Sequence, residues 1–222
     1  MNIAVILMSG SGNRLNESTP KQYLKINNKY LFLYPLETFL NNKDIDKIIL
    51  VVHKEYINFV SDIIKDNKIK IIEGGDTRIE STQNALNYLM DNNVKGDDII
   101  LIHDAARPLV SENLISNLIK ECKIKNAVTP VLKTKDTLVN VFDNEVSGYL
   151  NREIIYSNQT PQTFKFSLIY NAHMAMDKNK SYSDDTSIAL DYGIKIFTIP
   201  GEETNFKVTT KEDLELLKAY LK

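Results

Sequence analysis

The strongest constraint on the fold is an alternation along the chain between short apolar runs and segments with helical periodicity. The apolar runs are continuous, as is typical of strands covered on both faces. They are Ile3–Leu7, Lys47–Val52, Ile69–Ile72, Asp98–Ile102, Asn126–Val131 and Lys195–Ile199. The helical segments between them are Leu31–Leu40, Glu55–Ile64, Ile79–Met90 and Asn113–Cys122. This order predicts an α/β fold built on a doubly wound, mainly parallel sheet with right-handed crossovers.

One segment, about residues 134–158, breaks the alternation. It contains two strand-like pieces, Thr137–Phe142 and Glu145–Leu150, separated by Asp143-Asn144, which is a typical hairpin turn. We therefore expect a β-hairpin arm projecting from a single domain that spans residues 1–222. Since an exposed hairpin leaves unpaired strand edges, the arm is expected to form a homodimer, with a surface flap as the alternative.

Composition excludes several classes of protein. The chain has 27 Lys or Arg against 29 Asp or Glu, so its net charge of -2 gives no general attraction to nucleic acid or to an anionic membrane. The single cysteine, Cys122, cannot form an internal disulfide, and it falls on an apolar helical stripe, so we expect a buried thiol. The apolar N-terminal stretch is too short to span a membrane. We expect a cytoplasmic protein that binds neither nucleic acid nor membrane.

A glycine-containing loop after the first predicted strand is the first candidate for phosphate binding. It runs Ser9-Gly10-Ser11-Gly12-Asn13-Arg14 and continues to Pro20-Lys21-Gln22. Glycines let backbone amides approach a phosphate, and the cations Arg14 and Lys21 can hold a triphosphate. The loop is not a dinucleotide fingerprint, because Leu15 stands where a third small residue is needed, and it lacks the Gly-Lys-Ser/Thr of a Walker loop.

Five motifs in this order resemble those of the 2-C-methyl-D-erythritol 4-phosphate cytidylyltransferases and of the related ribitol-5-phosphate cytidylyltransferases. They are the glycine loop with Pro20-Lys21-Gln22; Gly74-Gly75-Asp76-Thr77-Arg78 with Ser81; His103-Asp104-Ala105-Ala106-Arg107-Pro108; Thr160-Pro161-Gln162; and Asn205-Phe206-Lys207-Val208-Thr209. The resemblance covers nearly the whole chain. It implies a Rossmann-like nucleotidyltransferase fold and transfer of a cytidylyl group from CTP to a polyol phosphate, with release of pyrophosphate.

The implied reaction is in-line attack of an acceptor phosphate oxygen on the α-phosphorus of CTP. Such a step depends on alignment and charge neutralisation more than on covalent catalysis. The acceptor is a phosphate monoester whose second pKa is about 6, so it is largely ionised at neutral pH and needs no general base. The sequence shows no histidine-containing catalytic constellation, in keeping with this chemistry, and we expect His103 to be structural.

The resemblance also implies roles for individual charged residues. Arg14, Lys21 and Lys207 are expected to hold the triphosphate and to stabilise charge at the α-phosphorus and on the leaving pyrophosphate. Asp104 is expected at a strand end, near Mg²⁺ and the substrate, because one carboxylate can suffice for this metal. Arg107 is expected to contact the substrate or to hold Asp104.

The remaining implied residues surround the nucleotide and the acceptor. The nucleotide-binding set is Met8, Ser9, Gly10, Gly12, Gly75, Asp76, Ser81 and Asp104. The acceptor-binding set is Asp104, Arg107, Thr137, Arg152, Thr160 and Ser183. Arginine suits the acceptor phosphate because its planar fork binds two oxygens. In the family the arm arginine comes from the partner subunit, which implies an active site shared across the homodimer.

The motifs leave the identity of the acceptor open. Asn151-Arg152 followed by Tyr156 is closer to the ribitol branch, whereas Ala105-Ala106-Arg107-Pro108 is closer to the methylerythritol branch. Methylerythritol 4-phosphate, an intermediate of isoprenoid precursor biosynthesis, is the main prediction. Ribitol 5-phosphate or another cell-envelope polyol phosphate is the alternative. Two alternatives come from other functional classes. They are a nicotinamide-binding oxidoreductase and a catalytically inactive dimeric binding protein.

Overall fold

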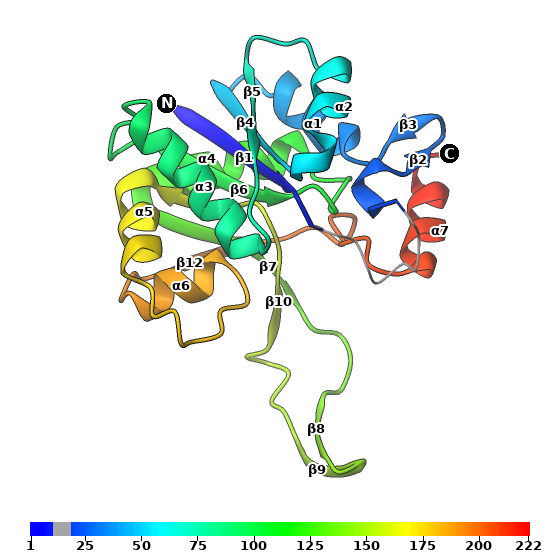
Figure 1. Ribbon diagram of the computed structural model, residues 1–222. Coiled ribbons are helices and arrows are strands. Elements are labelled where there is room, and N and C mark those ends of the chain that lie inside the picture. The colour runs from blue at the N-terminus through cyan, green and yellow to red at the C-terminus, as the bar shows by residue number, and fades with distance from the viewer. Residues whose placement is uncertain (11–18) are drawn as a thin grey trace.

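A mixed sheet with mostly parallel pairs forms the centre of the molecule (Figure 1). In this computed structural model, which describes residues 1–10 and 19–222, the strand order is β10-β7-β11-β6-β1-β4-β5, and β12 pairs with β7. The strands are β1 (Asn2–Met8), β4 (Lys47–Val52), β5 (Ile69–Glu73), β6 (Ile99–Asp104), β7 (Ala127–Lys133), β10 (Tyr156–Asn158), β11 (Gln162–Lys165) and β12 (Phe197–Pro200). Each of the six apolar runs thus contributes a strand, as predicted.

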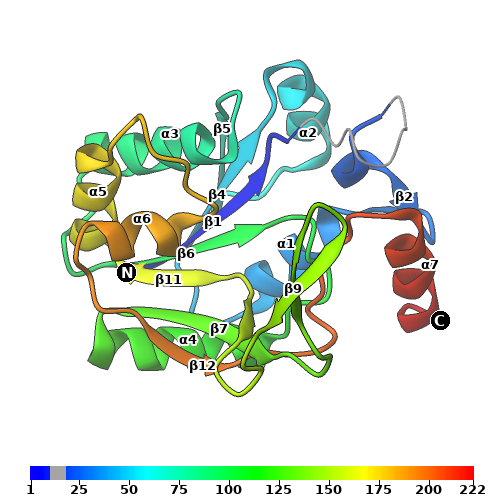
Figure 2. The ribbon, with the colours of Figure 1, turned by 90° about the horizontal axis from the view of Figure 1, so that it is seen from below.

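Helices cover both faces of this sheet, so alternate side chains of each central strand enter two separate cores. The helices are α1 (Leu33–Asn41), α2 (Ile57–Ile63), α3 (Arg78–Asp91), α4 (Glu112–Lys125), α5 (Phe166–Ala175), α6 (Asp185–Asp191) and α7 (Lys211–Tyr220), with short 3₁₀ turns at Lys21–Tyr23 and Lys54–Tyr56. Ala4 and Ile6 of β1 pack with α1, α2 and α4, whereas Ile3 and Val5 pack with α3, α5 and α6 (Figure 2). Burial on both faces explains why these strands read as continuous apolar runs.

One central strand is antiparallel, which the apolar pattern does not predict. β11 lies between β6 and β7 and runs antiparallel to both, with Gln162 opposite Ile102 and Phe164 opposite Ala127. Its sequence, Gln-Thr-Phe-Lys, lacks an apolar run, yet its first three residues are buried. The short strand β10 is also antiparallel to β7. The sheet is therefore mainly parallel, with an antiparallel insertion.

The predicted arm is present and projects away from the sheet (Figure 1). Its tip is a hairpin of β8 (Val139–Phe142) and β9 (Glu145–Tyr149). Asp143 and Asn144 both have positive φ, 52° and 64°, as the predicted two-residue turn requires. The arm ends earlier than predicted, because Tyr156–Asn158 is already paired with β7 in the main sheet. A second small hairpin, β2 (Lys25–Ile26) and β3 (Lys29–Tyr30), lies near α7.

Local signals explain where the helices begin. Capping boxes start α3 at Thr77, α6 at Asp184 and α7 at Thr210, and the Ser111 side chain caps α4.

Cys122 lies on the buried side of α4, where burial raises the pKa of its thiol to about 12. None of the helices within residues 1–10 and 19–222 combines the length and the apolar composition that a membrane span requires.

Candidate active site

Three of the predicted motifs meet at one edge of the sheet because their strands are parallel and in register. Leu7 lies opposite Asp104, and Met8 lies opposite Val52, which in turn lies opposite Glu73 of β5. The loops after β1, β5 and β6 therefore begin together at the carboxyl ends of their strands, where open α/β sheets place their ligand sites. The Met8 side chain is buried in the core, so a nucleotide could reach only the backbone there.

The first wall of this site joins the two glycine motifs. The hydroxyl oxygens of Ser9 and Ser81 lie 2.6 Å apart, and the backbone N–H of Gly75 donates to Ser81 Oγ at 3.1 Å. Ser81 in turn donates to the Thr77 carbonyl at 2.8 Å, so its one donor and two acceptor positions are all used within the chain. A Cβ on Gly74 would lie 2.4 Å from the Cβ of Ser9, which explains the need for glycine.

The Pro20-Lys21-Gln22 motif anchors the beginning of the phosphate-loop candidate. The Gln22 side-chain amide donates to the carbonyls of Met8 at 2.9 Å and Gly10 at 2.7 Å. The Tyr23 hydroxyl donates to the same Met8 carbonyl at 3.3 Å, and burial raises the pKa of this phenol. Lys21 Nζ donates to the Val208 carbonyl at 2.6 Å, next to Lys207. Motifs separated by 187 positions in the sequence are thus joined, and two of the predicted cations come to one region.

Asp104 lies at the end of β6 between two cations. Its Oδ2 is 2.6 Å from Lys207 Nζ, and its Oδ1 accepts from Arg78 Nε at 3.0 Å. Burial alone would raise the pKa of this carboxyl, but Arg78 and Lys207 outweigh burial and hold the pKa well below its usual range. Asp104 is therefore a carboxylate at neutral pH.

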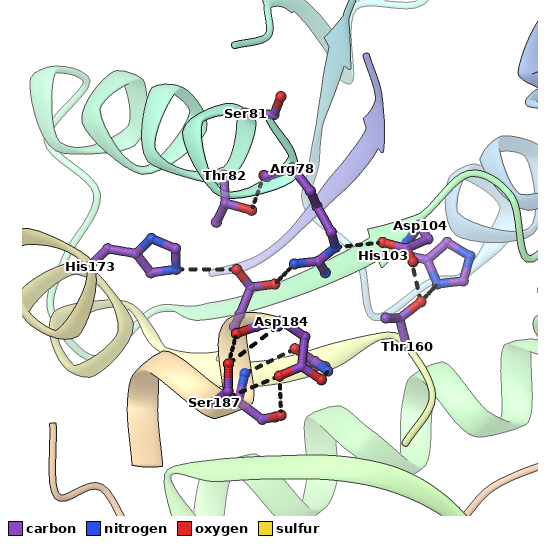
Figure 3. A network of polar contacts seen from close by, with 12 residues as sticks. Arg78, Ser81, Thr82, His103, Asp104, Thr160, His173, Asp184 and Ser187 are labelled. Carbon is purple, nitrogen blue, oxygen red and sulfur yellow. Dashed lines mark hydrogen bonds and ion pairs between the residues drawn. The ribbon is translucent and has the colours of Figure 1, made fainter. Parts of the chain in front are cut away.

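Arg78 bridges this carboxylate to a second one that is deeper in the protein. Its Nη1 lies 2.8 Å from Oδ2 of Asp185, and Asp185 Oδ1 lies 3.1 Å from Nε2 of His173. Figure 3 shows His173 and Asp104 on opposite sides of Arg78. Burial lowers the pKa of the guanidinium, but the two carboxylates outweigh burial and raise it above its ordinary value. Arg78 is a permanent cation held in place from both sides.

A buried hydroxyl fixes the backbone of Asp104. Thr160 Oγ1 accepts from the Asp104 N–H at 3.1 Å and lies 3.1 Å from Nδ1 of His103. His103 Nε2 lies 3.1 Å from the Arg107 carbonyl, which can only accept, so the neutral ring carries its proton on Nε2 and Nδ1 accepts from Thr160. His103 is fully buried, in agreement with the structural role expected for it, and burial lowers its pKa to about 4.

Arg107 binds backbone rather than the carboxylate beside it. Its two terminal nitrogens donate to the carbonyls of Asn205 at 2.8 Å and Asn158 at 3.3 Å. The ion pairs on Asp104 come instead from Arg78 and Lys207, so the expectation that Arg107 holds Asp104 is wrong. The physical reason is that these two carbonyls, one of them from the buried residue Asn205, need donors where the chain segments of the fourth and fifth motifs meet. Its predicted contact with substrate stays a prediction.

A family model described as 2-C-methyl-D-erythritol 4-phosphate cytidylyltransferase matches residues 2–222. The chain belongs to this family. A protein of that name from Thermotoga neapolitana is 40% identical over 223 residues, which cover 100% of this chain and 97% of the relative. One from Clostridium botulinum is 41% identical over 217 residues, 95% of each chain.

Solved structures of the cytidylyltransferase family share the fold. The crystal structure of Francisella tularensis 2-C-methyl-D-erythritol 4-phosphate cytidylyltransferase superposes with a TM-score of 0.85 at 31% identity, over 98% of both chains. The predicted Rossmann-like nucleotidyltransferase fold is therefore confirmed. The predicted enzyme class, a nucleotidyltransferase that transfers a cytidylyl group, is confirmed by family membership.

The remaining residues that the family resemblance implicates are either exposed or outside the described part of the chain. Thr137 and Arg152 are exposed on the arm, where Arg152 Nε is 3.9 Å from a carboxylate oxygen of Glu153. Asp76 and Ser183 are exposed on loops of the domain. Arg14 and Gly12 lie outside the described residues. Substrate contacts of all six predicted residues in these groups stay predictions. They are Gly12, Arg14, Asp76, Thr137, Arg152 and Ser183.

Sequence reasoning missed several members of the site. The motifs include Arg78 and, beside Ser183, also Asp185, but they indicate a role for neither residue, and they do not include His173. The motif position of Arg78, four residues after Gly74, is a usable signal. His173 and Asp185 carry none, since a lone histidine in an apolar helix and an acidic pair at a helix start are common patterns. Only the packing of α5 against α3, and of α6 against α5, brings them to Arg78.

Proposed function

We propose that this chain transfers the cytidylyl group of CTP to 2-C-methyl-D-erythritol 4-phosphate. A phosphate oxygen of the acceptor attacks the α-phosphorus, a new P–O bond forms, the bond to the bridging oxygen breaks, and pyrophosphate leaves. The observation that carries the proposal is the joining of Lys21, Lys207 and Asp104 at the sheet edge beside the two glycine motifs. Family membership supports the same reaction.

The cations are proposed to act through charge. Lys21, Lys207 and Arg14 would hold the triphosphate and stabilise the charge that develops at the α-phosphorus and on pyrophosphate. Lys207 is held by Asp104 and Lys21 by a backbone carbonyl, so both ammonium groups are placed before substrate arrives. Preorganised charge of this kind needs no reorganisation during the reaction.

A divalent cation is proposed to accompany CTP, held mainly by phosphate oxygens. Each oxygen of Asp104 receives one cationic donor and keeps a second acceptor position, so this carboxylate can also serve one metal ligand position. Within the described residues, no group of three or more His, Cys, Asp or Glu side chains could hold a metal by itself. The residues thus fit Mg²⁺ that arrives with the nucleotide, which would supply further neutralisation of phosphate charge.

The acceptor is proposed to be methylerythritol 4-phosphate rather than ribitol 5-phosphate. The family model and the relatives from T. neapolitana and C. botulinum carry the methylerythritol name. The reaction would therefore belong to isoprenoid precursor biosynthesis. A cytoplasmic location fits CTP as substrate and the single buried thiol.

The proposed function is tested by pyrophosphate release from CTP and Mg²⁺, with methylerythritol 4-phosphate and ribitol 5-phosphate offered in parallel. Turnover is expected with the first acceptor. Lys207→Ala is expected to lower kcat by about 10²–10³-fold, because one preorganised charge is lost. Lys211→Ala, which removes an exposed lysine four positions away, is the matched control and should leave kcat unchanged. Preference for ribitol 5-phosphate, or no turnover with either, would contradict the proposal.

A homodimer formed through the arm is proposed on the basis of exposed apolar side chains. Phe142 and Tyr149 at the arm tip are 77% and 75% exposed, and Val141, Val146 and Ile154 are also exposed. Several exposed large apolar side chains on one arm favour an interaction site there. Phe142→Ser combined with Tyr149→Ser is expected to produce monomers in sedimentation velocity experiments. The matched control is Tyr220→Ser, which changes an exposed aromatic residue outside the arm.

Whether the arm completes the partner's active site is tested by mixing two inactive variants. Lys207→Ala damages the core of the site and Arg152→Ala damages the arm. If sites are shared, each mixed dimer holds one intact site, so random mixing should restore about a quarter of the wild-type rate. If Arg152 instead serves its own subunit, mixing restores nothing. No recovery would therefore contradict the shared site.

A further inference from the structure

A row of charged groups that ends at a histidine leads from the sheet edge into the interior. It begins at Lys207 and continues through Asp104, Arg78 and Asp185 to His173, with 2.6 to 3.1 Å between successive partners. Asp185 is 0% exposed and His173 is 1% exposed, and neither has a role in the proposed reaction. A buried charged group must be compensated by a partner, so a carboxylate placed here has a specific task.

The task of Asp185 follows from how Arg78 is divided between two carboxylates. A guanidinium commonly binds one carboxylate with two parallel N–H groups. Here the Nε of Arg78 donates to Asp104, and its Nη1 lies 2.8 Å from Oδ2 of Asp185 in an ion pair. Asp104 therefore receives a single contact from the guanidinium and keeps acceptor positions for a ligand. Without Asp185, the guanidinium could turn its fork onto Asp104 and occupy both oxygens.

Asp185 is itself held rigidly at the start of α6. Asp184, the N-cap of this helix, accepts from the Ser187 N–H at 2.9 Å. Its other oxygen accepts from the side-chain amides of Asn158 at 2.8 Å and Gln162 at 2.7 Å. The first turn of α6 is thereby attached to strands β10 and β11 of the sheet. The Asp185 carboxylate is presented from a fixed backbone, as a positioning group needs.

His173 orients the carboxylate of Asp185 from the other side. Its Nε2 donates to Asp185 Oδ1, because an ionised carboxylate only accepts. Burial raises the pKa of Asp185, but Arg78 and His173 outweigh burial and keep it below its ordinary value. The carbonyl of His173 also accepts from the Gln83 amide on α3, the helix that carries Arg78. Helices α3, α5 and α6 thus form one supporting unit (Figure 3).

We propose that Asp185 and His173 are positioning residues for the cytidylyl transfer, holding Arg78 in the orientation that leaves Asp104 open to the nucleotide. The inference rests on the proposed function, since Asp104 matters only if that edge binds CTP. Asp185 and His173 touch neither substrate nor the reacting atoms in this scheme. They act through Arg78, as outer partners do when they orient a ligand-binding side chain.

The first test is a double-mutant cycle on the full-length protein. Asp185→Asn keeps the shape but removes the charge, and it is expected to lower kcat/KM with CTP by about 10–100-fold. Arg78→Met should cause a loss at least as large. Because Asp185 acts through Arg78, adding Asp185→Asn to Arg78→Met should cost little more. Losses that multiply in the double variant would overturn the proposal.

Asp191→Asn is the matched control, since Asp191 is the exposed last residue of the same helix and pairs only with surface groups in the described contacts. It should leave kcat/KM unchanged. His173→Gln, which keeps a side-chain donor, is the milder second variant if Asp185→Asn does not fold. It should lower kcat/KM in the same direction by a smaller factor. An unchanged kcat/KM in folded His173→Gln would count against the proposal.

A spectroscopic measurement separates this inference from the proposed function. The Arg78 Nε–H donates to Asp104, so its nuclear magnetic resonance signal reports the orientation of the guanidinium without any turnover. The signal should shift in Asp185→Asn and stay in place in Asp191→Asn. If the wild type has no cytidylyltransferase activity, the proposed function fails while this result still decides the positioning role. An Arg78 signal that does not move in folded Asp185→Asn overturns the proposed positioning role.

Discussion

Acid destabilisation by His103 is a prediction whose size follows from the structure. In the folded protein His103 is fully buried and its pKa is lowered from 6.5 to about 4, whereas the unfolded chain binds a proton near 6.5. Because the folded pKa is depressed, the neutral ring contributes stability that is present above pH 6.5 and is lost as pH falls toward 4. Linkage gives a loss of about 3 kcal/mol over the whole window, and about 2 kcal/mol between pH 7 and pH 5.

The assay is urea unfolding of wild type and His103→Gln at pH 7 and pH 5. The fall in unfolding free energy between these pH values should be about 2 kcal/mol smaller in His103→Gln, whatever its stability at pH 7. Asp104 and Asp185 have pKa values lowered from 3.8, so their contributions are lost only below this window. His53→Gln is the control, since His53 is partly exposed. Equal pH dependence in wild type and His103→Gln would refute the reasoning, as would a His103 titration midpoint near 6.5 by nuclear magnetic resonance.

Three further predictions concern residues that shape the site. Gly74→Ala should destabilise the fold by about 1–3 kcal/mol and weaken CTP binding, because the new methyl group would overlap Ser9; Gly148→Ala, where the nearest atom is 3.8 Å away, is the control for urea unfolding and CTP titration. Arg107→Lys should cost about 1–3 kcal/mol in unfolding free energy, because one ammonium cannot serve both backbone carbonyls; equal stability of variant and wild type would contradict this. Cys122 should react with an aromatic disulfide reagent only after unfolding, because its thiol is buried and its pKa is about 12; rapid labelling of native protein would count against this burial.

Local sequence patterns were sufficient for much of the framework. The runs at β1, β4 and β6 were recognisable because a strand covered by helices on both faces must be apolar at every position. The hairpin tip was recognisable because Asp143 and Asn144 tolerate positive φ. The order of the motifs, read together, was enough to identify the family and to select Lys21, Asp104 and Lys207, which the fold brings to one region.

Tertiary structure alone decided the rest. β11 is a central strand with a polar sequence, because the Gln162 side chain bonds to Asp184 and Thr186 at the start of α6 and the strand backbone is paired between β6 and β7. The partner of Asp104 proved to be Arg78 rather than the nearby Arg107, since spacing along a chain does not say which way a guanidinium turns. The pairing of Arg78 with Asp185 joins residues 107 positions apart through the packing of three helices. Contacts of this kind depend on the geometry of the folded chain, and the spacing of residues along the sequence does not specify them.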